Sequence, residues 1–248
     1  MGRAAVVGTV AVVVTLAGCA SSLPSRAPTS SASPTGVSTP VVAPLVPDPE
    51  QPPGVALTPA FSSSISTITP ELAERMSASW RPGCPVPLED LRYVTVTYRT
   101  FDDGADEQGE LVVHEDAAED VVTVFRVLFE AGYPVRSMRL VDDFGASDDD
   151  SMAADNTSAF NCRAITGGTG WSEHAYGRAI DLNPVENPYV RGGSVAPDAG
   201  QEFADRPDAP GVIHADDEVV RAFADVGWEW GGDWESPIDY QHFSASGR

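Results

Sequence analysis

The sequence predicts a single α+β domain, in which a small antiparallel sheet is flanked by helices, behind a signal peptide and a disordered linker. Segments with strand composition and segments with helical periodicity follow one another irregularly from about residue 65, which does not suit a repeating parallel β–α unit. An apolar run opens the chain, and a Pro-, Ser- and Thr-rich stretch separates it from the rest. We therefore expect a signal peptide over residues 1–18, a linker over residues 19–64 and a folded domain over residues 65–248.

The N-terminus has the layout of a secretory signal. Arg3 precedes an uncharged apolar run over residues 4–16, which is too short to span a bilayer. The run ends in Leu-Ala-Gly-Cys, which resembles the bacterial lipobox, where the chain is cut before the cysteine and Cys19 then carries lipid. This predicts an extracytoplasmic protein anchored to the cell membrane by its N-terminal lipid. An ordinary signal peptide with a chance cysteine is the alternative.

The linker is dominated by proline and small polar residues. Ten of the 21 prolines lie between residues 20 and 59, and such a composition does not form a packed core. Pro-rich chains favour extended conformations at roughly 3.1 Å per residue, so about forty residues can reach on the order of 100 Å. The linker would let the domain work at a distance from its anchor.

Helix-capping residues, β-branched residues and turn residues predict the first helix and the first two strands of the domain. Thr69 followed by Pro70 is typical of a helix start. Residues 92–98 are rich in β-branched and aromatic side chains, and the turn at 102–104 separates them from a second strand at 111–114. We expect these two strands to pair in antiparallel fashion.

The next elements alternate between helix and strand. Asp116 with Glu119 resembles a capping pair, and apolar residues then repeat at helical spacing until Gly132. Residues 134–141 have the composition of a strand, and residues 216–225 that of a helix.

Charge excludes one class of partner. Lys and Arg total 15 against 37 for Asp and Glu, which gives a formal net charge of -22. Such a chain repels phosphate backbones, so nucleic acid is not expected as a partner. We expect a monomer.

Two cysteines remain if Cys19 carries lipid. Cys84 and Cys162 form an even pair in an exported chain, which predicts one disulfide. Two free buried thiols are the alternative.

Two of the four histidines lie in segments dense with Gly, Trp and acidic residues. His174 precedes Gly177 and an expected strand at residues 179–182 that carries Asp181, while His242 follows near the C-terminus. A catalytic zinc takes three protein ligands and leaves a fourth position open, which His174, Asp181 and His242 can provide. His114 and His214 are expected to be structural or exposed.

Two further residues suit peptide-bond hydrolysis at such a metal. Asp239, three residues before His242, can take a proton from the attacking water and pass it to the leaving amine. Arg163 can stabilise the oxyanion or hold a substrate carboxylate. Pairing of Arg163 with one of the carboxylates at 148–150, which we expect to lie in a solvated turn, is the alternative.

The combined pattern resembles the zinc D-alanyl-D-alanine carboxypeptidases and related peptidoglycan peptidases of the VanY and VanX type. It comprises Ser-x-His, an Asp seven residues after that His, a late Trp-Gly-Gly-x-Trp and a carboxylate-x-x-His, and it extends over most of residues 84–243. The resemblance implies zinc ligands at His174, Asp181 and His242, a catalytic carboxylate at Asp239, and contact of Arg163 with substrate or transition state. It also implies that Ser172 lines the substrate site.

The resemblance implies hydrolysis of peptide bonds in peptidoglycan stem peptides, with release of a terminal D-alanine as the first hypothesis. Many relatives have Glu at the base position, and the Asp239 found here also occurs in a branch with endopeptidases, so cleavage inside the stem or cross-bridge stays open. A non-catalytic zinc-containing wall-binding domain is the hypothesis from another class. We treat Trp228, Trp230 and Trp234 as pocket walls, with Trp234 as a substrate contact, although packing roles are equally common for such residues.

Overall fold

The computed structural model describes residues 60–102, 106–166 and 168–247. The predicted signal peptide, Cys19 and the linker up to residue 59 lie outside these residues, so they stay predictions. No helix within the described ranges is both long and apolar enough to cross a membrane.

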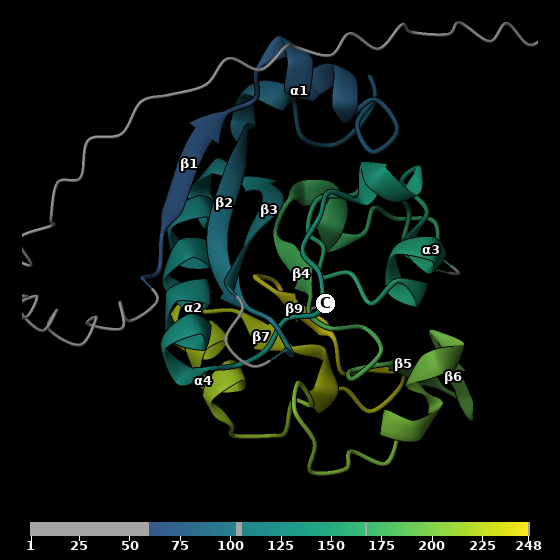
Figure 1. Cartoon of the computed structure of the whole chain (residues 1–248). Helices are drawn as coiled ribbons and strands as arrows, with labels where there is room; N and C mark the ends of the chain where they lie inside the picture. Colours follow the sequence, from purple (N-terminus) through teal and green to yellow (C-terminus); the bar gives the residue numbers. More distant parts are fainter. Residues whose placement is uncertain (1–59, 103–105, 167, 248) are drawn as a thin grey trace, which may run out of the picture. The chain divides into compact units, whose positions relative to one another are not determined.

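The described residues form small antiparallel sheets and a few helices, as expected for an α+β domain (Figure 1). In chain order the helices and strands are β1 (Ser63–Thr67), α1 (Pro70–Arg75), β2 (Leu91–Arg99), β3 (Asp106–His114), α2 (Ala118–Ala131), α3 (Asp148–Ala153), β4 (Ala179–Asp181), β5 (Tyr189–Arg191), β6 (Ser194–Ala196), α4 (Glu218–Asp225), β7 (Glu229–Trp230), β8 (Ile238–Asp239) and β9 (His242–Ser244). Three three-stranded sheets result, with strand orders β1-β2-β3, β4-β9-β7 and β6-β5-β8.

The first sheet contains the predicted strand pair. β2 and β3 are antiparallel, with Val94 opposite Leu111, and both side chains are buried. The pattern did not predict β1, which pairs with β2 from Ser63 onward and so includes two residues that we had assigned to the linker. All four of its Ser and Thr residues are exposed, and a polar edge strand of this kind lacks the apolar alternation that marks a strand in a sequence.

Helix α2 covers one face of this sheet (Figure 1). Its buried face includes Val121, Phe125 and Leu128, which join the same apolar core as the strands. Gly132 ends it with φ of 76°, a conformation that glycine adopts at low cost. The predicted capping pair is wrong, because residues 115–117 form a 3-10 turn and the helix begins at Ala118 with no side-chain cap.

The strand predicted at residues 134–141 is also wrong. Only single bridges form there, at Pro134 and Met138. The backbone N–H groups of Arg136 and Arg139 donate to the side chains of Asn183 and Asn156, respectively, instead of to a neighbouring strand. Buried side-chain amides thus satisfy the backbone without a ladder, which an apolar pattern does not reveal.

Two short helices differ in outcome. α1 begins where expected, with the Thr69 hydroxyl accepting from the backbone of Leu72. Residues 148–150 were expected in a solvated turn but form the first turn of α3, where Ser147 accepts from the backbone of Asp150.

Helix α4 packs against the sheet of β4, β9 and β7. Asp217 caps it, as its side chain accepts from the Val220 N–H at 3.0 Å. Phe223 of α4 stacks on Phe243 of β9, with ring centroids 3.9 Å apart. β4, β9 and β7 therefore rest on a fixed apolar layer, and the helix predicted at residues 216–225 is confirmed.

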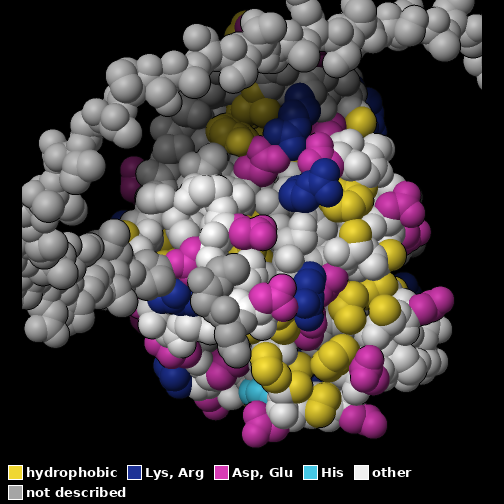
Figure 2. All heavy atoms as spheres, viewed as in Figure 1, with side chains coloured by type: hydrophobic (Ala, Val, Ile, Leu, Met, Phe, Trp, Pro, Cys, Tyr) yellow, Lys and Arg dark blue, Asp and Glu magenta, His cyan; other side chains and the backbone are white. Residues whose placement is uncertain are grey.

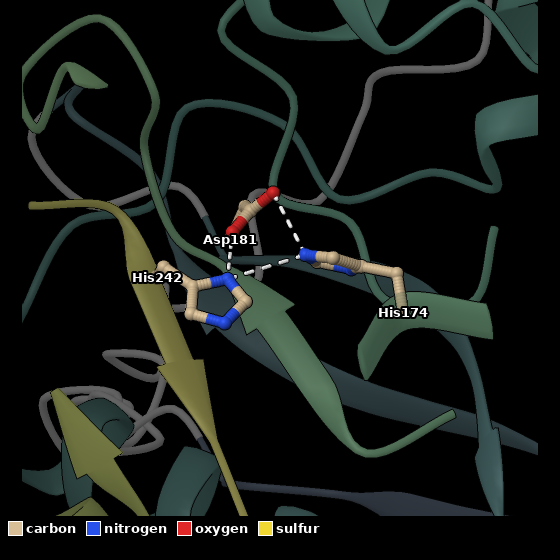
Figure 3. A group of neighbouring side chains, drawn as sticks. All are labelled: His174, Asp181 and His242. Atoms are coloured by element: carbon tan, nitrogen blue, oxygen red, sulfur yellow. Dashed lines mark hydrogen bonds and ion pairs between the residues drawn. The ribbon is translucent and has the colours of Figure 1, made fainter. Parts of the chain in front are cut away.

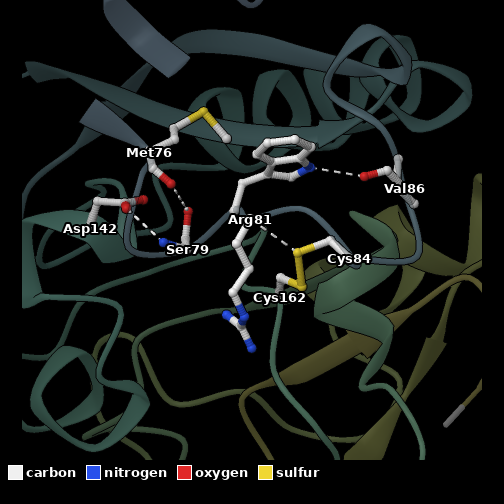
Figure 4. The surroundings of a disulfide bond; sticks show 8 residues. Met76, Ser79, Arg81, Cys84, Val86, Asp142 and Cys162 are labelled. Carbon is white, nitrogen blue, oxygen red and sulfur yellow. Dashed lines mark hydrogen bonds between the residues drawn. A yellow bond between two sulfur atoms is a disulfide. The ribbon is translucent and has the colours of Figure 1, made fainter. Parts of the chain in front are cut away.

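The disulfide expected between Cys84 and Cys162 is present (Figure 4). It ties the loop after α1 to the segment before Arg163, and the Cys162 N–H donates to the Ser79 carbonyl at 3.0 Å. The Ser79 N–H in turn donates to Asp142 at 2.8 Å. The backbone leading into Arg163 is thereby held from the α1 side.

Candidate metal centre

Two of the three expected ligands face each other across a strand pair. Asp181 of β4 lies directly opposite His242 of β9 in the antiparallel register. Residues in such positions point to the same face of a sheet, so their side chains are neighbours. Asp181 is 4% exposed and His242 6% exposed.

His174 approaches from the 3-10 turn η4 (Glu173–Tyr176), just before β4. The Ser172 hydroxyl accepts from the His174 N–H at 3.4 Å and caps this turn, and Gly177 ends it with φ of 66°. A Cβ on Gly177 would lie 2.5 Å from the backbone N of His114, so only glycine suits this return into the strand.

The tautomer of His174 is set by its backbone partner. Nδ1 of His174 lies 2.6 Å from the carbonyl oxygen of Ala159. Because a carbonyl only accepts, Nδ1 carries the proton and Nε2 presents its lone pair to the cluster. A hydrogen bond from the ring nitrogen that does not face the metal orients a metal-binding imidazole.

The three side chains converge on one point (Figure 3). His174 Nε2 lies 3.1 Å from Asp181 Oδ2, His242 Nδ1 lies 3.0 Å from Asp181 Oδ1, and the two ring nitrogens are 3.3 Å apart. A tetrahedral zinc with bonds of about 2.0–2.1 Å has ligand atoms about 3.3–3.4 Å apart. The spacing and the donor set therefore fit a zinc ion held by two imidazoles and one carboxylate.

Asp181 is held in its anionic form. Burial by itself would raise its pKa, but the positive charge that His174 and His242 carry when they are protonated, together with their hydrogen bonds, outweighs burial and holds the pKa of Asp181 well below its usual range. The cluster thus keeps one negative ligand at neutral pH, which favours binding of a divalent cation.

Asp239 lies beside these ligands, on β8, opposite Tyr189 of β5. Its Oδ1 is shielded from solvent and has no hydrogen-bond partner among the described residues. Burial raises the pKa of Asp239 to about 7, the charge of His242 opposes the rise, and the charge of Asp181 adds to it. A cation bound at the cluster would lower this pKa again.

The centre opens into a cavity of about 1220 Å³. Asp239, the three clustered side chains and Trp234 line it, together with Arg163. The lining carries eight Asp and Glu side chains against two Arg. Acidic side chains are also spread across the face shown in Figure 2.

Arg163 lies in the cavity wall and is already paired. Its Nη2 lies 2.9 Å from Oδ2 of Asp148, so the carboxylate partner that we left open is present, and both side chains are 24% exposed. Burial raises the pKa of Asp148, while the Arg163 charge opposes the rise. The pairing does not remove Arg163 from the site, because both residues line the cavity.

The other expected site residues have mixed surroundings. The Trp234 ring contacts the His242 ring with centroids 5.4 Å apart. Trp228 and Trp230 line the cavity but are only 4% and 6% exposed, so they also pack in the core. The one candidate metal cluster in the described residues contains neither His114 nor His214.

Two features of the site were not predicted. Gly231 is packed so closely that a Cβ there would lie 2.7 Å from the Asp239 carbonyl oxygen. The sequence left open a pairing of Arg163 with one of the carboxylates at 148–150, but it did not show that Asp148 is the partner or that the pair lies in the cavity. The Trp-Gly-Gly pattern was a signal for the first feature, and the acidic run at 148–150 was a weak signal for the second.

The fold and the cluster together define a candidate metallopeptidase centre, built on small antiparallel sheets with an open acidic cavity. The family model described as D-alanyl-D-alanine carboxypeptidase matches residues 166–245, which include all three clustered residues and Asp239. This confirms the resemblance inferred from the motifs, over about a third of the chain, and it supports a peptidase. No curated protein and no solved structure matches the chain.

Proposed function

We propose that the chain is a zinc-dependent peptidase that cuts peptide bonds in peptidoglycan stem peptides, releasing a terminal D-alanine. The observation that carries the proposal is the joint presence of three converging ligands and, in the same cavity, a shielded oxygen of Asp239 that has no partner among the described residues. A structural zinc usually has its fourth position closed by protein. The family match supplies the substrate class.

Each residue has a distinct role in this proposal. A zinc ion held by His174, Asp181 and His242 would polarise the scissile carbonyl and acidify the attacking water. Asp239 takes the proton of that water and later delivers it to the leaving amine. Arg163 donates hydrogen bonds to the oxygen on which negative charge develops.

The proposal is tested on purified protein loaded with zinc. Metal content is measured by mass spectrometry, and muropeptides are digested and weighed, where loss of one alanine is the expected product. Asp239→Asn should retain zinc and lose activity by about 10²- to 10⁴-fold, because a general base contributes that much. Asp233→Asn changes an exposed carboxylate in the same cavity and is the matched control. Zinc binding without any cleavage by the wild type would favour the non-catalytic wall-binding domain.

Endopeptidase activity is the second candidate, and the charge of the cavity favours it. A terminal carboxylate needs a cationic partner, but of the two Arg side chains in the lining, Arg163 is already paired with Asp148, and the lining as a whole is strongly acidic. A peptide cut internally brings no such carboxylate to the bond. Larger fragments in the same digestion would assign this activity.

The anchor is a separate proposal. We propose that Cys19 carries lipid and that the residues before the described domain, up to about residue 59, tether it to the membrane, because the lipobox-like sequence and the Pro-rich composition favour this. Cys19→Ser should move the protein from the membrane fraction to the soluble fraction of the cells that express it. Unchanged fractionation would contradict the anchor.

A further inference from the structure

We propose that Asp148 is a positioning residue, whose carboxylate holds the Arg163 guanidinium in the cavity of the metal centre. The inference rests on the proposed function, since it assigns to Asp148 the task of presenting Arg163 to the reacting carbonyl. It adds a residue that lies outside the segment matched by the family model.

The backbone of Arg163 is fixed on both sides. It follows Cys162 of the disulfide, and its carbonyl accepts from the Ser172 N–H at 3.1 Å, next to the turn that carries His174. The long side chain still has several free torsions, and such a side chain loses up to about 2 kcal/mol of rotamer entropy when it is ordered. A fixed backbone therefore does not by itself place the guanidinium.

Asp148 supplies the missing anchor. Within residues 60–102, 106–166 and 168–247, it is the carboxylate at salt-bridge distance from Arg163, at 2.9 Å. The other contact of the guanidinium is a long one, from Nη1 to the Ala164 carbonyl at 3.5 Å. The backbone of Asp148 is held in turn, because it begins α3 and Ser147 caps that helix.

The geometry leaves donors for a substrate. Asp148 pairs with Nη2, and Nη1 makes only the long contact to the Ala164 carbonyl, so N–H groups of these two atoms remain for a substrate, whereas Nε is shielded from solvent. An arginine held at one edge keeps its remaining N–H groups in a fixed direction. Without Asp148 the guanidinium loses its salt-bridge partner in an otherwise acidic cavity, so its direction is no longer set.

Asp148→Asn tests the proposal, with Asp149→Asn as the matched control. Both residues lie in the first turn of α3 and line the cavity, so both changes remove the same charge from the same helix end. We expect Asp148→Asn to lower kcat on muropeptides by about 10- to 100-fold with little change in KM and unchanged zinc content, because Arg163 acts in the transition state. Asp149→Asn should stay within about twofold of the wild type.

A double-variant cycle separates positioning from a direct role. Against Arg163→Ala, the change Asp148→Asn should cost almost nothing further, because its effect passes through the missing arginine. If Asp148→Asn lowered kcat as much in Arg163→Ala as in the wild type, the proposal would be overturned. Equal effects of Asp148→Asn and Asp149→Asn on kcat would overturn it as well.

A second readout does not depend on activity. Phenylglyoxal labels arginine guanidinium groups, and peptide mapping gives the labelling rate at Arg163. The rate should rise several-fold in Asp148→Asn and stay at the wild-type value in Asp149→Asn. A wild type that cuts no muropeptide would refute the proposed function, and equal labelling in all three proteins would refute the positioning by Asp148.

Discussion

Gly231→Ala tests whether close packing at the Trp-Gly-Gly segment sets the positions of Asp239 and His242. The φ of Gly231 lies outside the left-handed region, so alanine adds no backbone strain there. Its Cβ, however, would lie 2.7 Å from the Asp239 carbonyl oxygen, 3.0 Å from the Asp239 Cβ and 3.3 Å from the His242 Cβ. The effect of the substitution is therefore steric.

The magnitude follows from these three contacts. Carbon atoms pack at about 3.5–4.0 Å. The strands that carry Asp239 and His242 must therefore move away from the new Cβ at residue 231 by about 0.5–1 Å. A misplacement of about 1 Å at a catalytic centre can cost on the order of 100-fold. We expect kcat/KM to fall by about 10- to 100-fold, or about 1.4–2.7 kcal/mol in activation free energy, with weaker zinc binding.

The assay is muropeptide hydrolysis at several substrate concentrations, normalised to the folded fraction at the assay temperature. Gly170→Ala is the control, because its Cβ would lie 3.6 Å from Ile165 Cδ1, an ordinary contact. That variant should keep wild-type kinetics. Wild-type kcat/KM and zinc affinity in Gly231→Ala would refute the steric argument.

Two further predictions concern stability. Burial raises the pKa of Glu186 to about 7, with the neighbouring Asp155 adding to the rise, against 4.5 in an unfolded chain. The folded protein then binds a proton that the unfolded chain has lost, so stability falls as pH rises from about 5 to about 7. Glu186→Gln should flatten this dependence, and equal losses of Tm in both proteins between pH 5 and pH 8 would contradict it. Replacing Cys84 and Cys162 by Ser removes a cross-link over 78 residues and should lower the free energy of unfolding by about 4 kcal/mol in urea titrations, while a loss below about 1 kcal/mol would contradict this.

Local patterns in the sequence were sufficient for several elements. Helix α2 repeats apolar residues at helical spacing and ends at Gly132, and the pairing of β2 with β3 follows from β-branched runs on either side of a turn. These signals lie within a few residues of one another, so the chain carries them before it folds. The edge strand β1 lacked such signals, and the strand composition of residues 134–141 was misleading, because their backbone partners are distant in the sequence.

For the site, the sequence determined the residue types and the tertiary structure determined their relations. His174, Asp181 and His242 could be named from motif spacing, because a metal constrains which side chains serve as ligands. Only the fold places Asp181 opposite His242, closes Gly231 against Asp239, and brings α3 to Arg163. These relations depend on strand register and packing between distant segments, which no local pattern encodes.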